Sequence, residues 1–308
     1  MSSPQLESTV TVDDVEVERG AGWYAVRALP VLALIALAVT VFLYSRSEAV
    51  RETFHGIGAG LLSSGFWTAA GVGLAAQIVD GALGMAYGIT STTFLLSTGV
   101  PPAAASASVH IAEVFTTGFS GLSHWKLGNV NKALFKRLLI PGIIGAVVGA
   151  YIVTSIDGKV MRPYVSGYLL LMGLYILSKA FRRIIIATEP PTYVAPLALT
   201  GGFVDAVGGG GWGPVVTTSL LGSGQDPRTT IGSVNAAEFF LALASGVSFA
   251  VMGGFTVWTT IAGLIFGGLF AAPLAAVLTK HAPTKVLLII VGLLISGLSI
   301  YNLLQVFG

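Results

Sequence analysis

Four acidic residues lie within otherwise apolar stretches of the sequence: Asp80, Glu113, Asp205 and Glu238. They form two pairs, because Asp205 follows Asp80, and Glu238 follows Glu113, by the same 125 residues. A carboxylate in apolar surroundings is costly unless it is paired, protonated or hydrogen-bonded, so these acids are candidates for a functional site.

The two aspartates each open a glycine-rich segment, V-D-G-A-L-G-M-A-Y-G at 79–88 and V-D-A-V-G-G-G-G-W-G at 204–213. Two interpretations of Asp80 and Asp205 stay open. Each aspartate can cap a broken helix through backbone N–H groups, which is a structural role. Each can instead bind a cation or a proton.

The two glutamates each follow a polar residue by three positions, His110 before Glu113 and Asn235 before Glu238. Residues i and i+3 share a helix face, so we expect His110 to bond Glu113 and Asn235 to bond Glu238. This arrangement fits a proton relay or polar gate, and equally fits a pair of polar contacts between helices. The predicted coupling or gating residues are Asp80, His110, Glu113, Asp205, Asn235 and Glu238.

The glycine-rich segments predict helix breaks, because glycine adopts backbone torsions that other residues avoid. A break exposes amide N–H groups at the start of the next half-helix, and these groups attract anions. Hydroxyl side chains follow both breaks. Close helix packing by small residues is the alternative interpretation. The predicted substrate-binding residues are Gly84, Tyr87, Gly88, Thr92, Thr93, Gly209, Gly210, Trp212, Gly213, Thr217 and Thr218.

The composition indicates that the elements carrying these residues lie in a membrane. The chain has 308 residues, of which 54% are hydrophobic and only 10% charged, whereas soluble domains carry about 25% charged residues. The net charge of +2 gives no argument for nucleic acid, and the absence of cysteine excludes disulfides and thiolate metal sites.

Four regions are predicted along the chain. Residues 1–22 are polar and acidic and predict a disordered tail, and residues 23–46 predict an N-terminal transmembrane helix. Residues 61–183 and 193–304 predict two transport repeats. Over 79–128 a shift of 125 aligns identical polar and glycine residues, such as Gly88 with Gly213 and Pro102 with Pro227, which apolar composition alone does not explain.

The distribution of lysine and arginine predicts the topology, since these residues favour the cytoplasmic side. If each glycine-broken segment is a re-entrant hairpin, 12 basic residues lie inside and 4 outside; if each segment spans once, the division is 9 and 7. The hairpin topology is therefore favoured, and it inverts the second half relative to the first. The predicted fold is an all-α integral membrane protein of two inverted-topology repeats, each a re-entrant hairpin plus three transmembrane helices, preceded by one extra helix.

The duplicated D-x-x-x-G-x-G/M-x-x-G break, the following G-x-x-P and the glutamate of the next helix resemble the sulfite exporter TauE/SafE family over about residues 65–304. The first copy is weaker, reading G-A-L-G-M-A where the second reads A-V-G-G-G-G. The resemblance implies a carrier of sulfite, sulfoacetate or other organosulfur anions in the bacterial inner membrane.

The resulting expectation is a secondary transporter of a small sulfur-containing anion that works by alternating access. The alternative is an ion-coupled carrier of a cation or neutral metabolite that uses the buried acids. No cofactor, metal, nucleic-acid partner or enzymatic activity is expected, because no nucleophile motif, phosphate loop or ligand-spaced histidine pair is present. The lipid bilayer is an expected partner; proton coupling and homo-oligomerisation stay open.

Overall fold

The computed structural model describes residues 58–83, 85–181, 192–252, 258–281 and 284–307, together with residue 56. The predicted tail (1–22) and N-terminal helix (23–46) lie outside these ranges. Regular structure in the described residues is helical, which confirms the all-α prediction. The elements are α3 (Ser64–Leu83), α4 (Tyr87–Ser97), α5 (Pro102–Lys126), α6 (Lys132–Ser155), α7 (Gly158–Lys179), α8 (Val194–Gly208), η2 (Gly213–Thr217), α9 (Thr218–Gly222), α10 (Pro227–Val251), α11 (Trp258–His281) and α12 (Thr284–Phe307).

Among the described residues, four helices are long and apolar enough to cross a bilayer, namely α6, α7, most of α10 and most of α12. Large apolar side chains on these helices point outward, such as Tyr164, Leu171, Val247 and Leu293, each more than half exposed. An apolar exterior of this kind suits lipid rather than water. The described part of the chain is therefore a multi-pass membrane protein.

Both glycine-rich segments break their helices, as the sequence predicts. The first break separates α3 from α4, and Ala86 there has φ 93°, a left-handed conformation that costs energy for a residue with a Cβ. The second break separates α8 from η2, with φ of 64° at Gly209, 147° at Gly210 and 157° at Gly211. After this break the chain first forms a π-helical turn and then the short helix α9.

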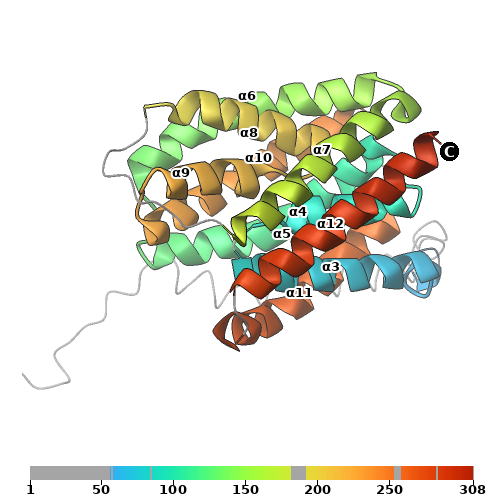
Figure 1. Cartoon of the computed structure of the whole chain (residues 1–308), viewed down its shortest axis with the longest axis horizontal. Helices are drawn as coiled ribbons and strands as arrows, with labels where there is room; N and C mark the ends of the chain where they lie inside the picture. The colour runs from blue at the N-terminus through green and yellow to red at the C-terminus, as the bar shows by residue number, and fades with distance from the viewer. Residues whose placement is uncertain are drawn as a thin grey trace, which may run out of the picture. The chain divides into compact units, whose positions relative to one another are not determined.

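The helices from the two halves pack in a reciprocal pattern, which can be followed in Figure 1. The first helix of half one, α3, lies along α11 of half two, and the first helix of half two, α8, lies along α6 of half one. The α5 and α10 helices pack together, as do α7 and α12. Glycine permits the closest of these approaches, since a Cβ on Gly202 of α8 would collide with the carbonyl oxygen of Gly142 of α6.

Helix α7 contacts the two broken helices at three positions along its length. Near its start, Arg162 Nη2 donates to the carbonyl oxygen of Leu96 in the last turn of α4, at 2.8 Å. The Tyr168 hydroxyl donates to the carbonyl oxygen of Gly210, in the second break, at 3.0 Å. At its end, Lys179 Nζ donates to the hydroxyl of Thr218 in α9. The half-helices α4 and α9 therefore extend toward opposite ends of α7, about 25 Å apart at 1.5 Å per residue.

Candidate functional site

The two helix breaks touch each other in the interior of the protein. A Cβ on Gly88 would lie 2.7 Å from the Cα atom of Gly210 and 2.9 Å from the carbonyl oxygen of Gly209, so the backbones meet where side chains are absent. The Thr92 hydroxyl donates to the Gly209 carbonyl oxygen at 2.6 Å. Residues 117 positions apart in the sequence thus form one site.

Asp80 and Asp205 brace the two breaks in the same way. Asp80 Oδ1 accepts a hydrogen bond from the Tyr87 amide at 3.2 Å, and Asp205 Oδ1 accepts one from the Trp212 amide at 2.8 Å. Each bond spans seven residues and satisfies one donor at the start of the following half-helix. The structure thus has the bond that the capping interpretation predicts, in both halves.

These bonds reduce the set of amides that can meet an anion. The Tyr87 and Trp212 amides are already occupied by carboxylates. The amides of Gly88 and Gly213, which are equivalent positions of the repeat, have no hydrogen-bond partner among the described residues. Both glycines line the cavity between the breaks, so their amides are among the candidates for anion contact.

A small polar cavity of about 20 Å³ lies between the breaks. A cavity needs roughly 10–15 Å³ to hold one water molecule, so this one is nearly closed. All four predicted acids contribute to its walls, and none of the described basic residues does. The lining residues are Asp80, Ala86, Tyr87, Gly88, Ile89, Glu113, Thr116, Thr117, Asp205, Gly210, Gly211, Gly213, Pro214 and Glu238.

A larger groove of about 660 Å³ lies elsewhere, among α5, α6 and α10. Its walls include Phe115, Trp125, Phe135 and Phe239 and offer almost no polar groups. A site that recognises a charged solute needs polar groups placed around it. The small cavity between the breaks is therefore the candidate functional site.

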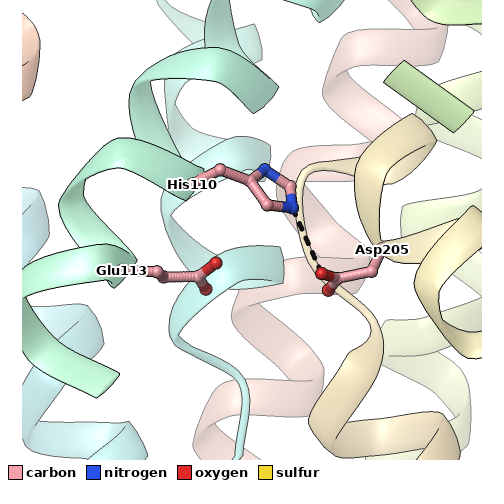
Figure 2. Close-up of side chains that lie close together, drawn as sticks. All are labelled: His110, Glu113 and Asp205. Carbon is pink, nitrogen blue, oxygen red and sulfur yellow. Dashed lines mark hydrogen bonds and ion pairs between the residues drawn. The ribbon is translucent and has the colours of Figure 1, made fainter. Parts of the chain in front are cut away.

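His110 does not bond Glu113, so that prediction is wrong. Its Nε2 atom lies 3.1 Å from Asp205 Oδ2 in the other half (Figure 2). Its Nδ1 atom lies 2.8 Å from the carbonyl oxygen of Ser106. The fold brings α5 against the end of α8, and this places His110 closer to Asp205 than to the glutamate on its own helix. The sequence spacing described one helix face correctly, but it carried no information about the neighbouring helix.

The prediction that Asn235 bonds Glu238 is also wrong. The Asn235 Nδ2 atom donates to the Ser120 hydroxyl of α5 at 3.0 Å, so Asn235 bonds across the α5–α10 interface instead of bonding Glu238. This contact matches the alternative interpretation of a polar contact between helices. The repeat-related residues His110 and Asn235 therefore have different partners.

Glu113 has an unpartnered oxygen in the buried site. The residue is 3% exposed, and its Oε2 atom has no hydrogen-bond partner in the part of the chain that the structure describes. Figure 2 shows the carboxyl group pointing from α5 toward Asp205. Donor atoms of His110, Glu113 and Asp205 all lie within 4.8 Å of one another, so these three residues could hold a cation or share protons.

The remaining predicted residues lie around the cavity without lining it. Trp212 is fully buried, and its Nε1 atom donates to the Val234 carbonyl oxygen at 3.2 Å. The Thr93 hydroxyl bonds back to Ile89 of its own helix, and Thr217 is buried in the π-helical turn. Gly84 lies outside the described residues.

Three kinds of contact at the site were not predicted from the sequence. Thr116 and Thr117 line the cavity, and their positions three and four residues after Glu113 could have indicated this shared helix face. The Tyr168 hydroxyl holds Gly210, and nothing in the local sequence signals that bond.

The third kind of contact is made by Lys179, which brings a positive charge close to the breaks. Its Nζ atom donates to the Thr218 hydroxyl of α9 and lies 3.2 Å from Met85 Sδ of the first break. No carboxylate partner of Lys179 is present in the described part of the chain. The sequence does not predict this contact, because the reach of Lys179 depends on how α7 crosses both breaks.

Comparison with known proteins agrees with this architecture. The profile of the family described as "Sulfite exporter TauE/SafE" matches residues 69–302. The "Probable membrane transporter protein YtnM" of Bacillus subtilis (strain 168) is 44% identical over 230 residues, which cover 72% of this chain and 77% of that protein. No solved structure matches the chain. The matched region contains both helix breaks and all four acids, and the chain belongs to the sulfite exporter TauE/SafE family of membrane transporters.

Proposed function

We propose that this protein moves a small sulfur-containing anion, sulfite or an organosulfonate such as sulfoacetate, across a bacterial plasma membrane by alternating access. The contact between the two helix breaks around one polar cavity is the observation that carries this proposal. Broken helices that meet inside a membrane are typical of carriers, since irregular backbone survives there only when it lines a cavity or is buried in protein.

The directions of the half-helices support two inverted repeats, residues 61–183 and 193–304. Leu96 at the end of α4 contacts the start of α7, whereas Thr218 of α9 contacts its end. We therefore place the two re-entrant hairpins on opposite sides of the membrane. The reciprocal packing of α3 on α11 and of α8 on α6 agrees with this symmetry.

The size of the cavity supports a carrier rather than an open channel. About 20 Å³ accommodates a water molecule but not a sulfite ion. Substrate entry therefore requires the breaks to separate, and we regard the structure as a closed state. Motion of α8 and α9 relative to α5 and α7 would open the cavity toward one side.

An anion can enter this site only if the four acids do not repel it. Protons on the carboxyl groups remove that repulsion, and the amides of Gly88 and Gly213, which have no hydrogen-bond partner among the described residues, can then contact the substrate. Lys179 supplies the positive charge at the edge of the site. Proton coupling follows naturally from this arrangement, and we assign no catalytic role to any of these residues.

Uptake of radiolabelled sulfite into proteoliposomes containing the purified protein tests the proposal. We expect accumulation that unlabelled sulfite or sulfoacetate reduces and that sodium or potassium chloride does not. Empty liposomes provide the background. Equal uptake with and without the protein, measured for sulfite, sulfoacetate and taurine, would contradict the proposal.

A cation or neutral metabolite is the second candidate substrate, and the acidic lining of the cavity specifically favours it. Four carboxyl groups without a basic residue in the cavity wall form a negative site if they are ionised. Competition by cations but not by sulfur anions in the same assay would favour this alternative.

A further inference from the structure

The contacts of His110 fix where its hydrogen atoms must lie. Nδ1 is 2.8 Å from the carbonyl oxygen of Ser106, and a carbonyl oxygen only accepts hydrogen bonds. The Ser106 hydroxyl, 3.3 Å from Nδ1, itself donates to the Ala206 carbonyl oxygen at 2.6 Å. One hydrogen atom therefore belongs on Nδ1.

A second proton is needed on the opposite side of the ring. Nε2 is 3.1 Å from Asp205 Oδ2, and a neutral imidazole with its hydrogen on Nδ1 presents a lone pair there. A lone pair facing an ionised carboxylate is repulsive. The contact is attractive when one more proton lies between the two atoms, on either His110 or Asp205. In both arrangements the pair is neutral overall.

The other neutral form of the ring fits less well. A hydrogen on Nε2 satisfies Asp205 but turns the bare Nδ1 lone pair toward the Ser106 carbonyl oxygen at 2.8 Å. With one hydrogen on Nδ1 and one proton between Nε2 and Asp205 Oδ2, both contacts are hydrogen bonds. This arrangement also leaves Asp205 Oδ1 free to keep its bond to the Trp212 amide.

The repeat provides only one such pair. Asn235, the residue equivalent to His110, cannot exchange a proton near neutral pH, and it bonds Ser120. The residue equivalent to Asp205 is Asp80. Among the described residues, Asp80 forms a hydrogen bond only with the Tyr87 amide. The two halves share their backbone braces but differ in this proton site.

The acidic surroundings of this pair favour keeping one proton on it. Its titratable neighbours are Glu113 on α5, Glu238 on α10, Asp80 on α3, Tyr87 on α4 and Tyr168 on α7, and the described side chains of α6, α11 and α12 add no ionisable group to the cavity lining. The ring of the buried Phe249 lies 5.9 Å from the His110 ring, centroid to centroid, so an apolar group packs beside the pair. A carboxylate oxygen of Glu113 lies in the same 4.8 Å cluster, and the Oε2 atom of Glu113 has no hydrogen-bond partner among the described residues, so this carboxyl group can receive a proton that leaves the pair.

We propose that His110 and Asp205 together bind one exchangeable proton that couples to transport and holds the two halves in the closed state. This inference rests on the proposed carrier function and names the site of its coupling proton. Transfer of the proton to Glu113 removes the attraction between α5 and α8 beside the second break, and it leaves the total charge that an entering anion meets unchanged. The break is then released, and the cavity can open.

The pH dependence of transport in proteoliposomes tests the proposal with His110→Asn, which introduces the side chain found at position 235. Wild-type sulfite transport should change by about tenfold per pH unit on one side of its profile, the limit for one essential proton. His110→Asn and Asp205→Asn should both remove this dependence, and Asp205→Asn keeps an oxygen that can accept from the Trp212 amide. The control is His124→Asn, since His124 bonds Asn129 near the end of α5. An unchanged profile in His110→Asn would overturn the proposal.

A second measurement does not require transport and keeps the test independent of the substrate. The melting temperature of the wild type without substrate should fall as pH rises from 5 to 9, because loss of the proton removes a bond of the folded state. That fall should be smaller in His110→Asn and unchanged in His124→Asn. Absence of sulfite transport together with this His110-dependent fall would reject the proposed substrate but keep the proton site.

Addition of manganese or zinc chloride distinguishes a metal site from a proton site. Stabilisation of the wild type by either metal at micromolar concentration, lost in His110→Asn, would identify a metal site and overturn the proton assignment. No stabilisation by metal, with the pH dependence above, supports it.

Discussion

The side chains around the two helix breaks serve two separate purposes. Asp80 and Asp205 hold the backbone of the breaks, whereas Glu113 points a free oxygen into the cavity. The sequence was sufficient to find these acids, because carboxylates are rare in apolar stretches and these recur with one spacing. It could not assign their partners, since His110 reaches Asp205 across an interface between helices that are far apart in the chain.

Lys179 gives a prediction at the same scale. Lys179→Gln should raise the KM for sulfite by roughly 10- to 100-fold, because a hydrogen bond to a charged group contributes about 1.5–3 kcal/mol. Lys179→Arg should keep most of the affinity. Transport kinetics in proteoliposomes measure both variants.

The control for this prediction is Lys159→Gln, which removes an exposed lysine at the opposite end of α7. It should leave the KM unchanged. Equal KM values for Lys179→Gln and the wild type would mean that Lys179 only fixes the orientation of α7.

At the scale of elements, glycine determines how closely the broken helices approach. The predicted breaks occur where the sequence places its glycine clusters, because only residues without a Cβ fit the torsions at 209–211 and the contact at Gly88. The break in the first half differs from this pattern, because the residue with a left-handed backbone there is Ala86 and not a glycine. The π-helical turn after Trp212 has no recognisable signal in the sequence.

Gly88→Ala should abolish transport and destabilise the fold. The added methyl group would lie 2.7 Å from Gly210 Cα and 2.8 Å from Glu113 Oε1, and such overpacking costs about 1–3 kcal/mol. Gly71→Ala in α3 is the matched control, because a Cβ there meets nothing within 4 Å. Melting temperature and sulfite uptake measure both variants; a Gly88→Ala protein as active and stable as Gly71→Ala would contradict the contact between the breaks.

The N-terminal cap of α10 gives a pH-dependent prediction outside the membrane. The carboxylate of Asp226 accepts from the Thr229 amide at 2.9 Å and the Thr229 hydroxyl at 2.7 Å, and these bonds lower the pKa of Asp226 below its usual value of 3.8. The stabilisation is therefore complete above that usual value and is lost as pH falls through the lowered pKa.

Asp226→Ala should accordingly lower the melting temperature at pH 7 and lower it less at the most acidic pH that the protein tolerates. Asp226→Asn, which retains an oxygen acceptor, should fall between the wild type and Asp226→Ala. The same loss of stability at every pH would show that the ionised carboxylate is not the capping group.

At the scale of the whole molecule, the duplication explains both what the sequence predicts and what it misses. Identical spacing of acids and glycines predicted two related halves with one broken helix each, and the structure contains both breaks. The reciprocal packing of α3 on α11 and of α8 on α6 was not predictable, because apolar helices of similar composition offer no distinct pairing signal. The inverted orientation of the halves is inferred from charge and from the contacts of α7.

Labelling of single cysteines from each side of the membrane tests this inverted arrangement most directly. The natural chain has no cysteine, so Thr98→Cys and Ser223→Cys each introduce a unique thiol. The two positions are equivalent in the repeat, and they end α4 and α9, where each hydroxyl bonds a carbonyl oxygen three residues earlier at 2.8 Å. In oriented membrane vesicles, an impermeant maleimide should label Cys at position 98 only from the outside and at position 223 only from the inside. Labelling of both positions from one and the same side would contradict the opposed hairpins, and with them the transport mechanism.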